Sequence, residues 1–155
     1  MSGGNIVAGK ADFQKADLSD SGSLYGMGSY FGPEYTADTL VALAIAVQDN
    51  LAQKAAGTLF ASLDADKQAA IRSHMQVELH GVDLTQGEVT VSTALADAIA
   101  SVREAIATKL LQSDPSEGYS KARSLDAVSA GHTADFLIYS ALTTVAYRPN
   151  STVSW

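Results

Sequence analysis

Residues 93–112, TALADAIASVREAIATKLLQ, carry the clearest structural signal in this chain. Apolar side chains recur there every three or four residues, which places them on one face of an α-helix. Arg103, Glu104 and Lys109 fall on other faces. Asp114-Pro115 ends the pattern, because proline disfavours helical backbone in the residue before it. We expect the apolar face to pack on a core through Leu95, Ile99, Val102, Ile106 and Leu110.

Similar patterns predict further helices on both sides of this segment, over residues 5–15, 36–56, 64–79 and 133–147. Thr36 is the expected N-cap of the second of these, with Asp38 in its first turn, where a negative charge suits the helix dipole. Asp64 or Ser62 is the expected cap of the next helix. Arg148-Pro149 ends the last one.

The segments between the helices differ in character. Residues 18–33 are polar and rich in glycine, which predicts an ordered loop. In residues 82–92, Val89 and Val91 alternate after a turn signal at Gln86-Gly87, which predicts a short extended connection. No linker divides the chain, so we expect a single domain over residues 1–155. The fold prediction is all-α, with about five helices, long ordered loops and one short extended connection.

Composition excludes several classes of function. The net charge of −7 and the pI near 4.7 argue against nucleic acid or an anionic membrane as a partner. The absence of cysteine removes disulfides, thiolate metal ligands and covalent attachment of a c-type haem. The apolar runs 40–47 and 136–146 are shorter than the roughly 20 residues that span a bilayer. The N-terminus lacks signal-peptide features, so an exported domain would take its leader or anchor from outside this sequence.

The sequence shows no catalytic constellation. His74 and His80 are six residues apart, on different faces of one helix, and His132 is far away in the chain. Structural or surface roles are the simpler interpretation of these histidines. Asp64 and Asp66 stand where a helix begins, which indicates capping rather than a carboxylate pair. We therefore expect that the chain is not an enzyme by itself.

Residues 26–35, GMGSYFGPEY, combine three glycines, a proline and three aromatic rings. Glycine permits unusual backbone angles and close approach, and Pro33 stiffens the exit from the segment. Two interpretations remain open at this point. The segment is either a packed loop with Tyr30, Phe31 and Tyr35 as core anchors, or a bend that presents backbone carbonyls to a neighbouring molecule.

Residues 8–40 resemble the opening of the extracytoplasmic hydrophilic domain of quinol-dependent nitric oxide reductases. That family shows a glycine-rich segment with a G-x-Y turn, followed by G-P, an acidic residue and a helix start with Ala-Asp. The matching positions here are Gly9, Phe13, Gln14, Gly22, Ser23, Gly26, Gly28, Tyr30, Gly32, Pro33, Glu34, Thr36, Ala37, Asp38 and Leu40. Residues 64–79, 84–98 and 133–155 resemble the later segments of the family in the same order.

The resemblance implies a cytochrome c-like helical fold without haem, on the extracytoplasmic side of a respiratory membrane. Its partner would be a membrane-embedded, haem-bearing subunit that reduces nitric oxide to nitrous oxide in denitrification. In the related cytochrome c-dependent enzymes, a calcium ion beneath the G-x-Y turn joins the small subunit to the haem propionates of the large one. The resemblance therefore implies Gly28 and Tyr30 as calcium ligands through their carbonyls. The residues implied in docking are Ser29, Phe31, Gly32, Pro33 and Asp38.

The chain also departs from the family pattern. Met27 replaces a histidine, Val41-Ala42 replaces a His-Arg pair, and the transmembrane helices that accompany this domain in the family are not in the sequence. We expect a non-catalytic accessory domain that docks on the reductase subunit, as a fragment, a separate subunit or a divergent relative. One alternative is a helical interaction module that self-associates, or docks on an unrelated assembly, through residues 40–51 and 136–145. Another is a haem carrier that uses a histidine with Met27 or Met75.

Overall fold

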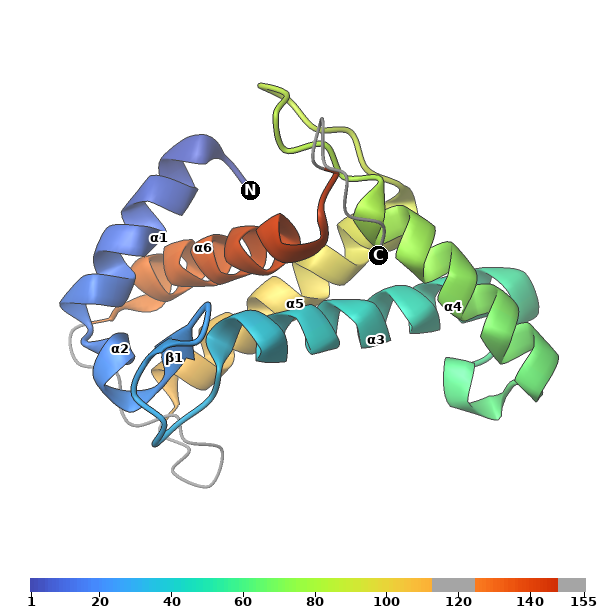
Figure 1. Cartoon of the computed structure of the whole chain (residues 1–155), viewed down its shortest axis with the longest axis horizontal. Coiled ribbons are helices and arrows are strands. Elements are labelled where there is room, and N and C mark those ends of the chain that lie inside the picture. The colour runs from blue at the N-terminus through green and yellow to red at the C-terminus, as the bar shows by residue number, and fades with distance from the viewer. Residues whose placement is uncertain (113–124, 148–155) are drawn as a thin grey trace.

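The computed structural model of the chain describes residues 1–112 and 125–147 (Figure 1). Four long helices, a shorter first helix and a one-turn helix account for most of it, so the all-α prediction is confirmed. The only sheet in the described part is a hairpin of two strands, each two residues long. The elements are α1 (Gly3–Lys15), α2 (Leu18–Ser21), β1 (Ser23–Leu24), β2 (Met27–Gly28), α3 (Tyr35–Ala56), the 3₁₀ helix η1 (Phe60–Ser62), α4 (Ala65–His80), α5 (Thr93–Leu111) and α6 (Ala127–Val145).

The core lies between α3, α5 and α6, and α1 packs across α6 on the side away from α4 (Figure 1). The stripe predicted on residues 93–112 faces this core, and only Ile99 of its members is partly exposed. Phe13 of α1 contacts Tyr35 and Phe136 with ring centroids 5.5 and 5.7 Å apart, both edge to face. These three rings join α1, α3 and α6.

Helices α1 and α6 approach each other most closely at Gly9. A Cβ atom added to Gly9 would lie 1.9 Å from the carbonyl oxygen of His132 and 2.9 Å from the Cβ of Phe136. Only a glycine lets the two backbones meet at this distance. The glycine in an otherwise ordinary helical pattern therefore marks the crossing point.

An ion pair with a buried carboxylate lies beside this crossing. Asp135 of α6 is inaccessible to solvent, and its Oδ1 accepts a hydrogen bond from Arg103 Nε of α5 at 2.7 Å. Its Oδ2 accepts one from the side-chain amide of Asn5 at 3.1 Å. A buried charge of this kind is tolerated because it is paired and hydrogen-bonded. Arg103 and Asn5 thus tie α5 and α1 to the middle of α6.

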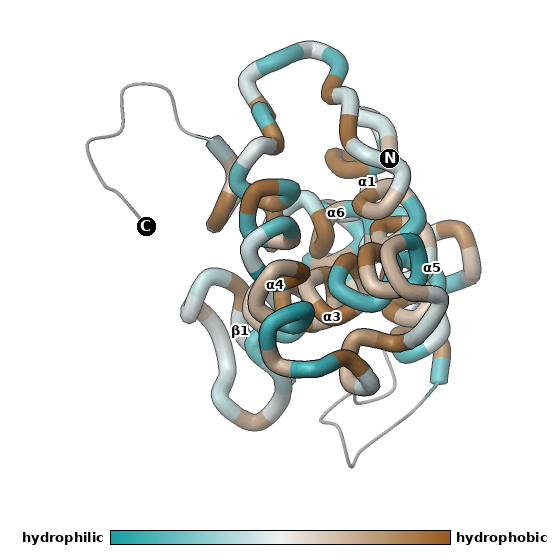
Figure 2. The backbone as a smooth tube through the Cα atoms, turned by 90° about the vertical axis from the view of Figure 1, so that its right-hand side faces the viewer, coloured by the Kyte–Doolittle hydropathy of each residue, from teal (hydrophilic) through white to brown (hydrophobic). Residues whose placement is uncertain are grey.

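Helix α4 is peripheral. Only Ile71 and Leu79 of its residues are buried. Figure 2, which views the molecule from the α4 side, shows apolar and polar residues alternating around its turns. Its end is fixed to the end of α6, because His80 Nδ1 forms a hydrogen bond with the carbonyl of Val145 at 2.8 Å. The backbone N–H of Tyr147 also donates to the carbonyl of Val82 at 2.9 Å.

The predicted helix positions are confirmed, with corrections at the ends. Thr36 is not the N-cap of α3: it lies inside the helix and is buried, and Glu34 caps the helix instead. Asp64, not Ser62, caps α4. Helix α6 begins at Ala127 behind the cap Asp126, six residues before the predicted start, because its first turns are small and weakly patterned. The predicted stops at 114–115 and 148–149 lie outside the described residues.

Two connections also differ from expectation. The loop predicted over residues 18–33 contains the one-turn helix α2 and both strands. The described residues 82–92 contain turns but no strand. Val89 and Val91 are instead half-buried against the core, and the side chain of Asp83 accepts hydrogen bonds from Thr85 that shape the turn.

The surfaces proposed for self-association are mostly internal. Residues 136–145 of α6 belong largely to the core, so this half of the self-association surface is wrong. In residues 40–51 of α3, Leu43 and Val47 are buried, while Val41 and Ile45 are exposed. Each helix in the described part of the chain is too short or too polar to cross a membrane.

Candidate functional site

The strands β1 and β2 form a hairpin closed by the two residues Tyr25 and Gly26. Both have positive φ, 54° and 72°. Two-residue hairpin loops with positive φ at both positions match the twist of the strands that they join. A tyrosine rarely adopts this conformation. Here its N–H donates to Thr36 Oγ1 at 3.0 Å, and its hydroxyl shares a hydrogen bond with Thr143 Oγ1 at 2.8 Å.

Glu34 fixes the hairpin to the start of α3. Its Oε2 accepts a hydrogen bond from the N–H of Ala37, which caps the helix. Its Oε1 accepts one from the N–H of Gly26 in the turn, at 3.1 Å. One carboxylate therefore holds both the first turn of α3 and the tip of the hairpin. The carboxylate also sits where the helix dipole favours negative charge.

Gly28 is required by the packing of the chain on itself. Its φ is 132°, and an added Cβ would lie 2.5 Å from the carbonyl oxygen of Gly22. The next residue, Ser29, donates its N–H to the carbonyls of Ser19 and Gly22 at 3.0 and 3.1 Å. The glycine at position 28 thus has a reason within the molecule, independent of any ion.

The hairpin register leaves the Gly28 carbonyl on the open edge of β2. Leu24 pairs with Met27 around the two-residue turn, and Ser23 pairs with Gly28. Because hydrogen-bonded and non-hydrogen-bonded pairs alternate, and Ser29 again donates to Gly22, the Ser23 to Gly28 pair is the non-bonded type. The peptide groups of Gly28 then point away from β1. None of the hydrogen bonds between described residues ends on the carbonyl of Tyr30.

The aromatic side chains of the bend, defined as residues 28–31, face solvent. Tyr30 is 89% and Phe31 94% exposed, so their interpretation as core anchors is wrong. Tyr35 alone of the three is a core residue, at 1% exposure. Its hydroxyl donates to the carbonyl of Leu18 at 3.3 Å, and burial raises the pKa of Tyr35 to about 12. The aromatic side chains of the bend are therefore exposed, whereas Tyr35 belongs to the core.

The residues implied in docking lie in the bend, directly after it in the chain, and in the first turn of α3. The N–H of Phe31 donates to Ser29 Oγ at 3.3 Å, and the carbonyl of Pro33 accepts from the N–H of Ser23 at 3.0 Å. Gly32 lies between them and is half-buried. Asp38 is exposed in the first turn of α3, as predicted. The structure thus gathers the predicted site residues at one end of α3.

The histidines do not form a site with one another. His74 is exposed, and His80 binds the end of α6. His132 Nδ1 lies 3.7 Å from Asp12 Oδ2 at the crossing of α1 and α6. In residues 1–112 and 125–147, no three His, Cys, Asp or Glu side chains cluster as metal ligands would. A cation at the bend would depend on carbonyl oxygens.

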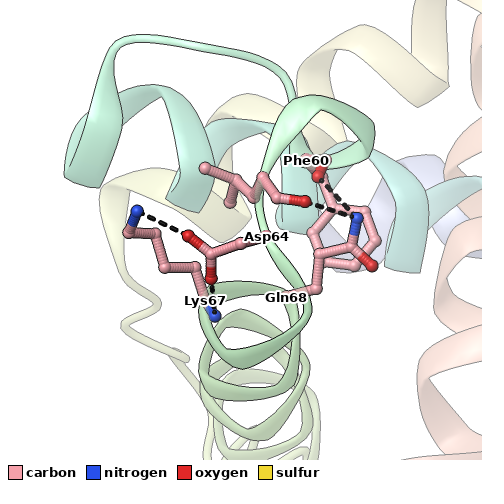
Figure 3. Close-up of polar contacts among 5 residues, drawn as sticks. Phe60, Asp64, Lys67 and Gln68 are labelled. Atoms are coloured by element: carbon pink, nitrogen blue, oxygen red, sulfur yellow. Dashed lines mark hydrogen bonds and ion pairs between the residues drawn. The ribbon is translucent and has the colours of Figure 1, made fainter.

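The carboxylate of Asp64 is a helix cap, as expected (Figure 3). Its Oδ1 accepts a hydrogen bond from the N–H of Lys67 at 2.9 Å, and its Oδ2 lies 2.6 Å from Lys67 Nζ. The hydrogen bonds from Lys67 lower the pKa of Asp64. Beside it, Gln68 Nε2 donates to the carbonyl of Phe60 at 3.4 Å (Figure 3). These contacts hold the start of α4 and form no separate site.

Sequence reasoning missed the residues that build the bend. Glu34 precedes the helix start that was predicted, and Tyr25 and Thr36 contact each other only after the hairpin has folded back on α3. The spacing of Glu34 from Ala37 is the available signal, because a side chain three residues before an N–H is the usual capping distance. The positive φ of Tyr25 has no signal of this kind.

Comparison with known families decides the classification. The full chain, residues 1–155, matches the NorB cytochrome c-like family, which is the cytochrome c-like domain of the nitric oxide reductase protein NorB. The chain belongs to this family. No curated protein matches it. Membership in the NorB cytochrome c-like family associates this domain with nitric oxide reductase and with the setting of a membrane-bound reductase. The all-α fold is consistent with that membership.

Proposed function

We propose that this NorB cytochrome c-like domain is a non-catalytic, haem-free module that docks on the membrane-embedded, haem-bearing subunit of a nitric oxide reductase. It stabilises that subunit and covers its cofactors from the extracytoplasmic side. The observation that carries the proposal is the bend at residues 28–31. The N–H of Ser29 ties the bend to the carbonyls of Ser19 and Gly22, and two side chains of the bend are almost fully exposed.

The way the bend is built supports docking. Tyr25 in the turn is anchored to both α3 and α6, and Glu34 clamps the turn to the cap of α3. A surface that is rigid before binding loses little conformational entropy when a partner covers it. Exposed aromatic side chains such as Tyr30 and Phe31 are the type of residue that contributes most at protein interfaces.

The absence of cysteine supports a haem-free role, because a c-type haem is attached through cysteine thioethers. The alternative haem carrier needs a histidine and a methionine that face each other. Met27 is exposed in the hairpin, whereas His80 is occupied with the carbonyl of Val145. His132 is beside Asp12, where α1 crosses α6. These placements favour the haem-free proposal.

The same geometry supports a calcium site to which this domain would contribute two backbone carbonyls. Calcium takes six to eight oxygen ligands, including backbone carbonyls, at about 2.3–2.6 Å. The Gly28 carbonyl lies on the open edge of β2, and the Tyr30 carbonyl has no internal acceptor role in the described chain. Two carbonyls cannot complete the shell, so the remaining oxygens would come from the partner and water. Calcium would then bind at the joint between subunits, and only weakly to the isolated domain.

The test is co-purification with the membrane-embedded subunit from the same organism. Tyr30→Pro removes the local N–H and restricts φ in the bend, and it should reduce the fraction of domain that co-elutes. Thermal unfolding of the isolated variant should stay near that of the wild type, because Tyr30 is not in the core. The control variant is Val128→Ser, which removes another exposed side chain, in the first turn of α6.

Divalent ions separate the calcium role from docking in general. Removing calcium with EGTA should weaken co-elution of the wild type, and adding calcium should restore it better than magnesium, which demands tighter octahedral geometry. Co-elution that is unaffected by both Tyr30→Pro and EGTA would contradict the proposal. If Tyr30→Pro weakens co-elution and EGTA does not, the docking proposal stands and the calcium role is refuted.

A further inference from the structure

Helix α3 carries an exposed apolar stripe on the side opposite the core. Val41 and Ile45 are 57% and 55% exposed and are four residues apart, so they are neighbours on one helix face. Leu43 and Val47 of the same helix have no exposed area. The stripe therefore points away from the core, and no packing need within the described chain explains its apolar side chains.

The stripe lies on the helix whose N-cap holds the hairpin. Glu34, the cap of α3, binds the hairpin turn, and Ser23 of β1 forms a parallel bridge with Glu34. Thirteen large hydrophobic residues are exposed in the described chain, and six of them fall within residues 25–45. We call these six the loop–helix surface: Tyr25, Met27, Tyr30, Phe31, Val41 and Ile45. A concentration of exposed apolar groups of this kind marks an interaction site.

The segment of the chain that carries the loop–helix surface has charges of one sign only. Between Lys15 and Lys54 the sequence contains no Lys or Arg, but it contains five Asp and Glu residues. Asp17 and Asp20 are exposed at α2, which contacts both strands of the hairpin. Such a surface repels anionic lipid headgroups and nucleic acid, and it repels the same face of a second copy. It attracts a cationic surface.

We infer that the loop–helix surface binds a cationic face of the reductase subunit, which has Lys or Arg side chains around an apolar seat for Val41 and Ile45. The identity of the partner rests on the proposed function. The inference adds a second contact area and the chemistry of the partner, neither of which the carbonyls of the bend require. Apolar contact supplies the affinity, and charge supplies the rate and orientation of association.

The contact area is tested by binding of the domain to the detergent-solubilised membrane subunit. The double variant Val41→Gln/Ile45→Gln should weaken binding about tenfold, since each side chain loses the gain from burying its exposed part. The matched control is Val7→Gln/Val77→Gln, which changes two similarly exposed valines inside α1 and α4. Glutamine is compatible with helices, so neither variant should unfold. Equal affinity of both double variants and the wild type overturns the inference and leaves the proposed function standing.

The charge is tested by salt and by neutralisation. Raising NaCl from about 50 to about 500 mM should weaken wild-type binding several-fold, because it screens charges across the interface. Asp17→Asn/Asp20→Asn should reduce that dependence, whereas Asp97→Asn/Glu104→Gln on α5 should not. Binding that is independent of salt, or that strengthens with it, contradicts a cationic partner.

If the reductase subunit does not bind the domain at all, the proposed function fails. A second experiment then tests the inference independently of that subunit. The probe is an amphipathic Lys/Leu peptide titrated into the labelled domain, with a Glu/Leu peptide of equal length as control. Amide shifts confined to residues 25–45 and seen only with the Lys/Leu peptide support the inference. Shifts elsewhere, or equal shifts with both peptides, overturn it.

Two further outcomes identify other occupants. Binding to phosphatidylcholine–phosphatidylglycerol vesicles that Val41→Gln/Ile45→Gln abolishes would assign the surface to a membrane. A dimer in sedimentation equilibrium that the same variant dissociates would assign it to a second copy. Either result overturns the inference.

Discussion

The crossing of α1 and α6 gives the sharpest test of the fold, through the substitution Gly9→Ala. The added Cβ would stand 1.9 Å from the carbonyl oxygen of His132, and real Cβ atoms keep at least 3.0 Å from their neighbours. The obstacle is backbone and cannot rotate away, so the two helices must separate by about 1 Å. This separation also loosens the contact between Phe13 and Phe136.

The expected cost follows from two opposing effects. Overpacking of a close contact costs about 1–3 kcal/mol and occasionally more, and a backbone clash belongs at the upper end. Replacing glycine by alanine inside a helix returns up to about 1 kcal/mol. The net loss should therefore be about 2–3 kcal/mol, or roughly 5–10 °C in Tm for a chain of this length.

Urea and thermal unfolding followed by circular dichroism measure this loss. Gly4→Ala in the same helix is the matched control, because the nearest atom to its added Cβ is Ser2 Oγ at 3.9 Å. The control should be as stable as the wild type or about 0.5 kcal/mol more stable. A Gly9→Ala protein with unchanged or raised stability would refute the close approach of α1 to α6.

Three further predictions follow from single contacts. Arg103→Met should lower the free energy of unfolding in urea by about 3 kcal/mol, because it leaves the buried Asp135 carboxylate without its cation. Asp135→Asn should cost less, since Arg103 is partly exposed and can be hydrated. Equal losses for the two variants would contradict this asymmetry. The pKa of Tyr35 is about 12 in the folded protein and 10 in the unfolded chain, so the contribution of the neutral hydroxyl to stability is complete below pH 10 and is lost as the pH rises towards 12. Unfolding of Tyr35→Phe measured against pH should lack this alkaline loss. An alkaline stability profile identical to that of the wild type would argue against burial of the hydroxyl. Ser92→Ala should destabilise the protein by about 1 kcal/mol in thermal unfolding, because the Oγ of Ser92 accepts a hydrogen bond from the N–H of Leu95 at 3.1 Å and caps α5. Thr93→Ala, at the exposed neighbouring residue, is the control. A loss no larger than that of the control would refute the cap.

The candidate site shows which parts of a surface segment are visible in a sequence. The unusual mixture of glycine, proline and aromatic residues at 26–35 indicated a special segment, and the family pattern placed Gly28 and Tyr30 within it. The interpretation of Gly28 as a residue that admits an ion was incomplete. Its immediate neighbour is the carbonyl of Gly22, and only the folded hairpin brings that atom there.

The sequence by itself determined the helices, because each long one repeats its apolar side chains with the helical period and needs no distant residue to reveal it. It also excluded attachment of a haem through cysteine and placed the acidic segment between Lys15 and Lys54. Only the tertiary structure decided that Tyr35 enters the core while Tyr30 and Phe31 face solvent. The hairpin likewise consists of two-residue strands, whose few local hydrogen bonds cannot hold them alone. Contacts with Glu34 and Thr36 at the start of α3, and with Thr143 from far along the chain, stabilise it, and the hairpin sequence itself does not encode these contacts.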